Sequence, residues 1–268
     1  MPYRPDIPDE GMIDAIEENG AEFLLAMGRA AGAEEHCTSS VHWIIGGSPI
    51  DYHNCVVRAD LGPADADTTI AASIARFEAH GVPGTWHVGP SMWPLHLGDR
   101  LLRHGFVESG ADIDMAIELD QLPASLPGPE TLVIERVADE LSLAAWTSVL
   151  ARSFGEGEPE SAWVGEIYRR IGLSDDVPWR HFLGRLDGEP VATASLFVGA
   201  GAAGIYVVST LPAARHRGIG AAITLAALRA GRELGQRLGV LGSSSDGYPV
   251  YRRLGLRDPC RIRLFAWH

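Results

Sequence analysis

Apolar residues recur along the chain at two spacings, which predict the order of helices and strands. Residues 9–32 carry apolar side chains three and four positions apart, typical of an amphipathic helix, with an interruption expected near Gly20. Short β-prone runs bounded by Gly, Pro or Asp predict strands instead. Further helices are expected over 65–80, 94–104, 141–153, 162–171, 220–238 and 248–254. Strands are expected over 39–45, 53–57, 85–88, 112–119, 131–136, 179–186, 190–198, 205–208, 239–242 and 261–267.

The periodicity stops in the middle of the chain, where three prolines fall within the seven residues 123–129. This composition predicts an extended linker over 121–130. The chain of 268 residues is longer than most single domains. We therefore predict an α/β (α+β) protein with two domains, 1–120 and 131–268.

The charge of the chain is negative overall but unevenly distributed. The net charge is −13, and all 22 basic residues are arginine. Residues 209–268 contain 10 arginines and only 3 acidic residues. A locally basic half suits a polyanionic cofactor, whereas the overall charge argues against nucleic acid and is compatible with a cationic substrate. Solubility alone explains the acidity equally well.

Neither a membrane segment nor a metal site is expected. No run of 18 apolar residues occurs, and residues 1–10 lack the apolar core of a signal peptide, so we expect a soluble, cytoplasmic protein without membrane contact. The three cysteines have no C-x-x-C spacing, and the ten histidines show no H-E-x-x-H pattern. We therefore expect reduced, buried cysteines and no metal.

Residues 207–222 combine a strand end, a glycine turn and a helix start. Arg215, Gly218 and Gly220 form the spacing R-x-x-G-x-G directly before a long apolar-periodic segment. Free N–H groups at a helix N-terminus bind anions such as a pyrophosphate, and glycines let the ligand approach the backbone. An ordinary strand-to-helix turn is the alternative.

A second glycine pattern is not expected to bind a nucleotide. Residues 199–204, Gly-Ala-Gly-Ala-Ala-Gly, match the dinucleotide fingerprint G-x-G-x-x-G. A strand follows them where the fingerprint requires a helix, so no helix N-terminus would hold the pyrophosphate. We interpret this segment as a hairpin turn.

The turn at 215–220 resembles the acyl-CoA-binding loop of the GNAT superfamily of N-acyltransferases, whose pattern is [QR]-x-x-G-x-[GA] after a strand. Residues 251–256, Tyr-Arg-Arg-Leu-Gly-Leu, are similar to a second GNAT signature, Tyr-x-x-x-Gly-Phe, with Leu256 in place of Phe. The two patterns stand in the family's order. The resemblance implies a mixed, mostly antiparallel central sheet flanked by helices.

The resemblance also implies roles for individual residues. Tyr251 would be the general acid that protonates the departing thiolate, although it could instead only pack its helix, and Tyr248 is the fallback acid. Ser244 would contact the pantetheine arm or cap the next helix, two alternatives of equal weight. The remaining cofactor contacts would come from the backbone of Val207, Val208, Ser209, Arg215, His216, Arg217, Gly218, Ile219, Gly220 and Ala221.

The general base is not identified by the pattern. Relatives cover the acceptor site with the region that here contains Glu156, Glu158, Glu160 and Glu166. An exposed acidic loop is usually only solvated, so none of the four is preferred.

The first half repeats the ending of the second. Residues 86–89, a helix and residues 101–106 parallel 240–243, a helix and residues 251–256, with Leu101 at the position of Tyr251. The segment before the expected helix 65–80 lacks R-x-x-G-x-G. We predict that residues 1–120 are a degenerate GNAT-like copy without cofactor loop or acid.

The resemblance implies an N-acetyltransferase that uses acetyl-CoA as co-substrate and a primary amine, of a small molecule or a protein, as acceptor. A non-catalytic acyl-CoA sensor or a transferase for a longer acyl-CoA are the alternatives. A homodimer is compatible with the sequence, which specifies neither the oligomeric state nor the acceptor.

Overall fold

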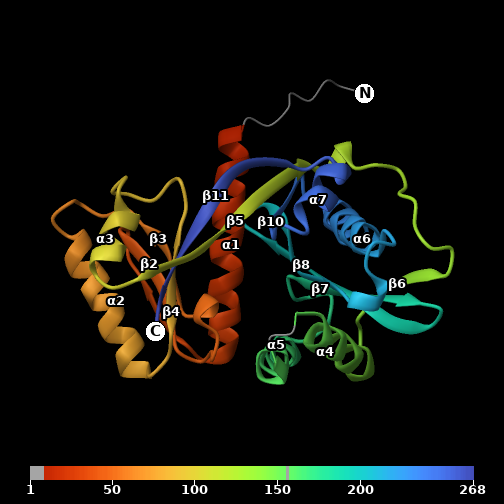
Figure 1. Cartoon of the computed structure of the whole chain (residues 1–268), viewed down its shortest axis with the longest axis horizontal. Coiled ribbons are helices and arrows are strands. Elements are labelled where there is room, and N and C mark those ends of the chain that lie inside the picture. Colours follow the sequence, from red (N-terminus) through yellow and green to blue (C-terminus); the bar gives the residue numbers. More distant parts are fainter. Residues whose placement is uncertain (1–8, 155–156) are drawn as a thin grey trace. The chain divides into compact units, whose positions relative to one another are not determined.

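The computed structural model describes residues 9–154 and 157–268, and in this part of the chain seven α-helices and eleven β-strands alternate (Figure 1). The helices are α1 (Asp9–Ala31), α2 (Ala66–His80), α3 (Leu97–Arg103), α4 (Glu140–Phe154), α5 (Gly157–Ile171), α6 (Ile219–Glu233) and α7 (Tyr248–Leu254). The strands are β1 (Glu34–Cys37), β2 (Val41–Ile45), β3 (Cys55–Ala59), β4 (Gly84–Val88), β5 (Val107–Glu118), β6 (Leu132–Arg136), β7 (Trp179–Leu186), β8 (Glu189–Gly199), β9 (Ala202–Thr210), β10 (Leu238–Ser243) and β11 (Arg257–Trp267). The mixed α/β class predicted from the sequence is confirmed.

The chain divides into two compact units that do not follow the chain order. Unit 1 comprises the described residues up to Asn19 together with Asp114–Pro259. Unit 2 comprises Gly20–Ile113 and Cys260–His268. This division differs from the expected boundaries, because α1, β5 and β11 each contribute residues to both units.

Unit 1 is built on a sheet with the strand order β5-β10-β9-β8-β7-β6. Strands β6 to β9 pair antiparallel in sequence, whereas β10 pairs parallel to β9. Helices α4 and α5 lie together on one face of this sheet and α6 on the other (Figure 1). The long strands are rich in buried apolar residues because helices cover both faces.

Unit 2 has the strand order β1-β2-β3-β4-β11 and carries α2 and α3. Its β3 and β4 pair parallel, and residues Arg263–Trp267 of β11 pair antiparallel with Val88–Gly84 of β4. Ile70, Phe77, Trp86 and Phe265 are fully buried in its core. The last strand of the chain therefore completes the sheet of the unit built mainly from the first half.

Several elements differ from the sequence prediction. Helix α1 runs through Gly20 without interruption, and β1 was not predicted because its four residues are all exposed and show no alternation. Helix α6 ends at Glu233, before Gly235 at φ +87°, although a helix was expected over 220–238, and the next residue, Leu234, is 45% exposed. Glycine adopts this left-handed conformation without steric cost, which ends the helix early.

Both glycine hairpins are two-residue turns. Asp187-Gly188 joins β7 to β8 and Ala200-Gly201 joins β8 to β9, with positive φ at all four residues. The interpretation of residues 199–204 as a hairpin is therefore correct.

The second hairpin is fastened by a buried amide from α1. The side chain of Asn19 is fully buried and donates from Nδ2 to the carbonyl oxygens of Gly199, at 2.8 Å, and Ala202, at 3.2 Å. Its Oδ1 accepts a hydrogen bond of 2.7 Å from the hydroxyl of Tyr206. Gly204 lies against this amide, and a Cβ there would clash with it. Three polar groups of the hairpin are thus satisfied by one side chain.

Three histidines are held in apolar surroundings. Burial, together with the positive charges of Arg136 and Arg180, lowers the pKa of His181 in unit 1 to about 3. In unit 2, burial lowers the pKa of His53 to about 3 and that of His87 to about 4. The folded protein therefore holds these side chains neutral at pH values where the unfolded chain protonates them.

We predict that the free energy of unfolding falls as the pH is lowered from about 6.5 to about 4. In this range the three histidines bind protons in the unfolded chain but stay neutral in the folded protein. Each buried histidine adds a slope of up to about 1.4 kcal/mol per pH unit. Denaturant titrations between pH 7 and pH 4 measure this slope. His181→Gln should reduce it, whereas His96→Gln, at a side chain that is 85% exposed, should leave it unchanged. An equal slope in His181→Gln and wild type would contradict the prediction.

Candidate functional site

Strand β9 is paired along most of its length with β8 but only at its beginning with β10. The parallel register with β10 joins Ala202–Gly204 to Leu238–Val240. Residues 205–210 and 241–243 extend beyond this register. An extended ligand could therefore pair with the end of β9, where the register between β9 and β10 has ended. Val207 and Val208, expected to contact the pantetheine arm, lie in this part of β9.

A β-bulge interrupts β9 at Val207 and Val208. On either side of it, Thr193 pairs with Ser209 and Ser195 pairs with Tyr206, so two residues of β9 face one residue of β8. Val207 has a φ of +54°. A β-branched residue rarely adopts this conformation, which marks the bulge as a strained feature of the kind that clusters at functional sites.

The bulge changes the faces to which the last residues of β9 point. Ser209 points to the same face as Thr193, and their hydroxyl oxygens lie 2.7 Å apart. Thr210 points to the face of α6, where its hydroxyl is 3.6 Å from the place that a Cβ on Gly220 would occupy. Without the extra residue both side chains would exchange faces, since successive residues of a strand alternate.

The turn after β9 leads into a helix N-terminus without a side-chain cap. A short 3₁₀ turn, Pro212–Ala214, precedes His216 at φ +61° and Gly218 at φ +81°, the N-cap of α6. The first helical hydrogen bond of this cap runs from the N–H of Ala222 to the carbonyl of Gly218. The N–H groups of Ile219, Gly220 and Ala221 precede it, as the open first turn of an anion-binding helix requires.

Arg215 fastens this turn to the rest of unit 1. Its Nε donates to the carbonyl of Thr210 at 3.1 Å and its Nη2 to the carbonyl of Ser153 at 3.1 Å. His216 and Arg217 are exposed on either side of the turn's tip. Arg215 thus stabilises the shape of the loop, while Arg217 adds positive charge to it.

Gly218 is constrained by both conformation and space. Besides its positive φ, a Cβ on it would lie 2.8 Å from the carbonyl oxygen of Pro127. The expected linker therefore passes directly over the loop. Arg229 of α6 holds the linker by donating to the carbonyls of Pro123, at 2.9 Å, and Ala124, at 2.6 Å.

Tyr251 lies on α7 with its phenol directed into the protein. The residue is 8% exposed, and burial raises the pKa of the phenol to about 12, a shift that the neighbouring Thr224 opposes. Thr224 is in the second turn of α6, where its hydroxyl donates to the carbonyl of Gly220 at 2.8 Å. The structure therefore brings Tyr251 to the same helix that begins with the glycine turn.

Ser244 and Tyr248 have contacts within their own segment. The Oγ of Ser244 accepts the N–H of Gly247 at 3.2 Å, and its carbonyl accepts the N–H of Tyr248, as in a polar turn before a helix. The hydroxyl of Tyr248 donates to Asp258 at 3.1 Å. These bonds favour the capping role for Ser244 and a structural role for Tyr248.

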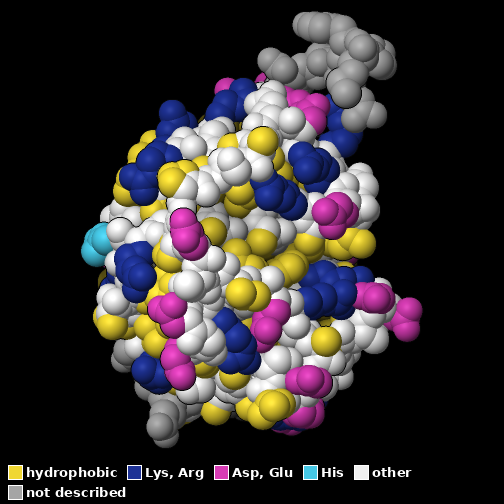
Figure 2. Space-filling model, turned by 90° about the vertical axis from the view of Figure 1, so that its right-hand side faces the viewer, with side chains coloured by type: hydrophobic (Ala, Val, Ile, Leu, Met, Phe, Trp, Pro, Cys, Tyr) yellow, Lys and Arg dark blue, Asp and Glu magenta, His cyan; other side chains and the backbone are white. Residues whose placement is uncertain are grey.

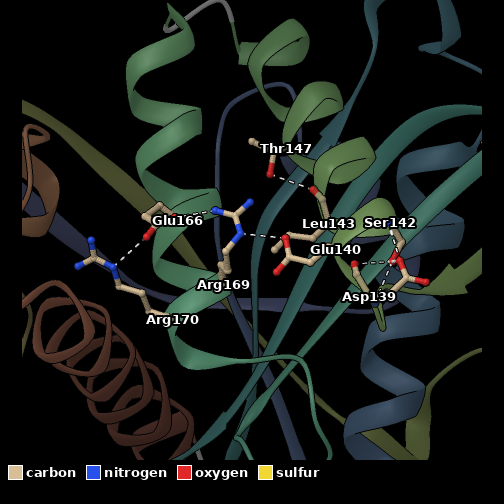
Figure 3. Close-up of polar contacts among 8 residues, drawn as sticks. All are labelled: Asp139, Glu140, Ser142, Leu143, Thr147, Glu166, Arg169 and Arg170. Carbon is tan, nitrogen blue, oxygen red and sulfur yellow. Dashed lines mark hydrogen bonds and ion pairs between the residues drawn. The ribbon is translucent and has the colours of Figure 1, made fainter.

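The carboxylate of Glu166 lies in an ion-pair network on α4 and α5 (Figure 3). Arg169 bridges Glu166 and Glu140, at 2.6 and 2.9 Å, and Arg170 binds the other oxygen of Glu166 at 3.1 Å. Both arginines lower the pKa of Glu166, Arg169 most strongly. A carboxylate held ionised by two cations is a weak proton acceptor, so Glu166 is a poor candidate for a general base. Glu156 and the side chain of Glu158 lie outside the described residues, and Glu160 is half-buried.

Metal ligands and disulfides are not found in the described part of the chain. It contains no group of three or more His, Cys, Asp or Glu side chains arranged to hold a metal ion. Cys55 and Cys260 are buried free thiols as expected, but Cys37 is exposed, because it lies on the edge strand β1. No described helix is long and apolar enough to cross a membrane.

Basic side chains are scattered over the face shown in Figure 2 and do not form one continuous basic surface. Acidic and hydrophobic side chains lie between them. This mixture on the visible face suits local recognition of an anion better than binding of an extended polyanion.

Two residues of the site were missed at the level of sequence. Thr193 contacts the bulge, and Thr224 lies beside Tyr251. Both are fully buried polar residues within apolar segments, Thr193 on β8 and Thr224 on α6. A threonine among buried positions was the available signal, but it does not indicate which group the hydroxyl contacts.

Comparison with known proteins finds a family match at this site. Residues 139–256 match the model of the acetyltransferase (GNAT) family, which uses acyl-CoA as co-substrate. The matched segment contains the bulge, the glycine turn and Tyr251. No curated protein is significantly similar to the chain.

Solved structures share the fold over nearly the whole chain. A GCN5-related N-acetyltransferase from Kribbella flavida superposes with a TM-score of 0.72 at 19% identity, covering 92% of this chain and 95% of that one. One from Sphaerobacter thermophilus gives 0.63 at 18% identity, over 95% and 93%. A tandem GNAT protein from the clavulanic acid biosynthesis pathway gives 0.57 at 15% identity, over 85% and 78%. At these identities the likeness concerns the fold.

We predict that Gly218→Ala lowers the melting temperature, because the new Cβ meets the Pro127 carbonyl and alanine disfavours φ +81°; the cost should be about 1–3 kcal/mol. Gly220→Ala is the matched control, since its Cβ would meet only the Thr210 hydroxyl, at an ordinary 3.6 Å. Thermal unfolding of both variants measures the difference. Equal melting temperatures for Gly218→Ala and wild type would show that the linker and loop are not packed as described.

Proposed function

We propose that the chain is an N-acetyltransferase that moves the acetyl group of acetyl-CoA to a primary amine of a small molecule or a protein. The observation that carries the proposal is the meeting, in unit 1, of an uncapped helix N-terminus, a strained bulge and a buried phenol around the ends of β9 and β10. The GNAT family model over the same residues supports it.

The glycine turn would hold the cofactor by its pyrophosphate. The N–H groups of residues 219–221 and the positive end of the α6 dipole favour an anion there, and α6 has no acidic residue in its first turn. The pantetheine arm would then extend along the end of β9, past the last residue paired with β10.

The transfer itself needs positioning, charge stabilisation and one proton donor. The neutral amine attacks the thioester carbon, and negative charge develops on the carbonyl oxygen. We assign the N–H of Val208, in the bulge, to this oxygen. The carbon–sulfur bond then breaks and Tyr251 gives its proton to the leaving sulfur. The surplus proton of the amine nitrogen passes to solvent water, from which the Tyr251 phenolate is reprotonated.

The environment of Tyr251 suits a proton donor. Because burial raises its pKa to about 12, the phenol remains protonated throughout the physiological pH range. The thiolate of CoA is less basic than the phenolate, so the proton transfer is uphill by itself. It proceeds because charge develops on sulfur as the carbon–sulfur bond breaks and because the phenolate is then reprotonated.

We also propose that residues 1–120 and 131–268 are two copies of one fold, with 121–130 as the linker. In both halves a strand pairs parallel with the strand that follows the next helix, β3 with β4 and β9 with β10. The helices α3 and α7 end alike, with bonds of 3.1 Å from the N–H of Phe106 to the carbonyl of Leu101 and from the N–H of Leu256 to that of Tyr251. This match supports Leu101 as the counterpart of Tyr251.

The first copy lacks the features of a phosphate site. Helix α2, the counterpart of α6, begins with Asp65 as its N-cap and Asp67 in its first turn. These carboxylates would repel a pyrophosphate at the helix N-terminus. We therefore assign cofactor binding to the second copy alone.

Binding and turnover of acetyl-CoA test the proposal. Calorimetric titration with acetyl-, propionyl- and succinyl-CoA establishes donor preference, and thiol release with polyamines, amino sugars, amino acids and a lysine-containing peptide establishes the acceptor class. Absence of acyl-CoA binding overturns the proposal. Tight binding without thiol release for any amine would instead support a sensor.

We predict that Tyr251→Phe lowers kcat with the best amine of this panel by about a hundredfold or more, since the leaving sulfur loses its proton donor. The dissociation constant of acetyl-CoA should change little, because the phenol acts at the departing sulfur. Tyr248→Phe, one helical turn earlier, is the control and should keep kcat within about threefold of wild type. If kcat fell in Tyr248→Phe but not in Tyr251→Phe, Tyr248 would be the general acid and Tyr251 the structural residue.

A further inference from the structure

The bulge residue Val207 adopts a conformation that its own side chain opposes. Its φ of +54° places it in the left-handed region, which non-glycine residues enter at a cost of roughly 1–2 kcal/mol, and more for a β-branched one. Such a conformation persists only where surrounding groups determine it. The contacts of Val207 should therefore identify what holds it.

A buried hydroxyl on the neighbouring strand holds the carbonyl of Val207. The Oγ1 of Thr193 donates to this carbonyl at 2.9 Å, and Thr193 is fully buried. The Oγ of Ser209, itself 7% exposed, lies 2.7 Å from the same Oγ1. Because Thr193 uses its only proton on Val207, Ser209 is the donor of the second bond. The order of donation is thus Ser209 to Thr193 to the Val207 carbonyl.

This bond also sets the direction of the next N–H. The peptide between Val207 and Val208 is trans, since the described residues contain a cis bond only at Trp93-Pro94. In a trans peptide the C=O and the following N–H point in opposite directions within one plane. With the Val207 carbonyl directed at Thr193, the N–H of Val208 points away from that hydroxyl.

We propose that Thr193 is a positioning residue for acyl transfer: by holding the Val207 carbonyl it aims the N–H of Val208 at the thioester carbonyl, with Ser209 fixing the rotamer of Thr193. This inference rests on the function proposed above and extends it to residues outside the glycine turn. Thr193 touches neither cofactor nor acceptor in this role. It acts through the peptide between Val207 and Val208, whose orientation determines where the N–H of Val208 points.

The first experiment compares Thr193→Val, which keeps the shape but removes the hydroxyl, with Thr193→Ser, which keeps the hydroxyl. Thr193→Val should lower kcat by about tenfold to a hundredfold, less than the loss of an entire oxyanion donor. Thr193→Ser should restore most of the rate. The dissociation constant of acetyl-CoA should stay within about threefold in both variants, because the pyrophosphate is bound by the glycine turn.

A spectroscopic measurement separates an effect on the direction of the Val208 N–H from an effect on the stability of the protein. Infrared spectra of acetyl-CoA labelled with ¹³C at the thioester carbonyl report the polarisation of that bond in the binary complex, without an acceptor. The stretch should shift to lower frequency on wild type and return toward its free value on Thr193→Val. An unchanged frequency and kcat in a folded Thr193→Val would overturn the proposal.

A glycine at position 207 provides a second test. Glycine adopts positive φ without steric cost, so the bulge in Val207→Gly needs less support from Thr193. The fall in kcat caused by Thr193→Val should therefore be smaller in the Val207→Gly background than in wild type. The same fold-loss in both backgrounds would show that Thr193 does not hold the strained residue.

Ser209→Ala keeps the test informative if Thr193→Val does not fold. It leaves the bond from Thr193 to Val207 intact but frees the rotamer, so kcat should fall by only a few-fold. A loss of about a hundredfold would overturn the order of donation. Failure of wild type to bind acetyl-CoA would remove the proposed function itself, whereas binding and turnover unaffected by all these variants would remove only the role of Thr193.

Discussion

The site depends on one constraint, that β9 cannot stay paired with both of its neighbours to its end. The parallel register with β10 ends at Gly204 and Val240, and the antiparallel register with β8 is interrupted by the bulge three residues later. The backbone N–H and C=O groups of a strand in the middle of a sheet normally form hydrogen bonds with both neighbouring strands. Here both pairings are interrupted before the end of β9, in the part of the strand to which we assign the thioester.

Irregular backbone of this kind is held by a few side chains, of which Thr193 and Asn19 are buried and Arg215 is exposed. Thr193 holds the bulge by donating to the carbonyl of Val207. Arg215 holds the glycine turn through the carbonyls of Thr210 and Ser153, and Asn19 holds the hairpin before β9. Each satisfies carbonyls that the regular ladder leaves behind, and an unsatisfied buried carbonyl would be costly. In unit 1 the bulge, the glycine turn and the hairpin before β9 are thus each held by hydrogen bonds from one side chain.

The proposed duplication would explain how one framework gains or loses a ligand site. Both halves have the parallel strand pair and the same end to the short helix α3 or α7. They differ in the first turn of the long helix between the two parallel strands, which is acidic in α2 and free of acids in α6, and in Leu101 against Tyr251. On this proposal, a few side chains at matching positions govern whether an anion and a leaving thiolate can be accommodated.

The sequence by itself determined the fold class, most helices and strands and the glycine turn at Arg215 to Gly220, because helical periodicity, turn glycines and short motifs act over a few residues. Only the tertiary structure decided that the last strand completes unit 2, that α1 supplies Asn19 to a distant hairpin, and that Thr193 meets Val207. Strand pairing and buried hydrogen bonds join residues far apart in the chain, and no local pattern specifies their partners. For the same reason the exposed strand β1 escaped prediction, since its pairing with β2 rather than its own composition makes it a strand.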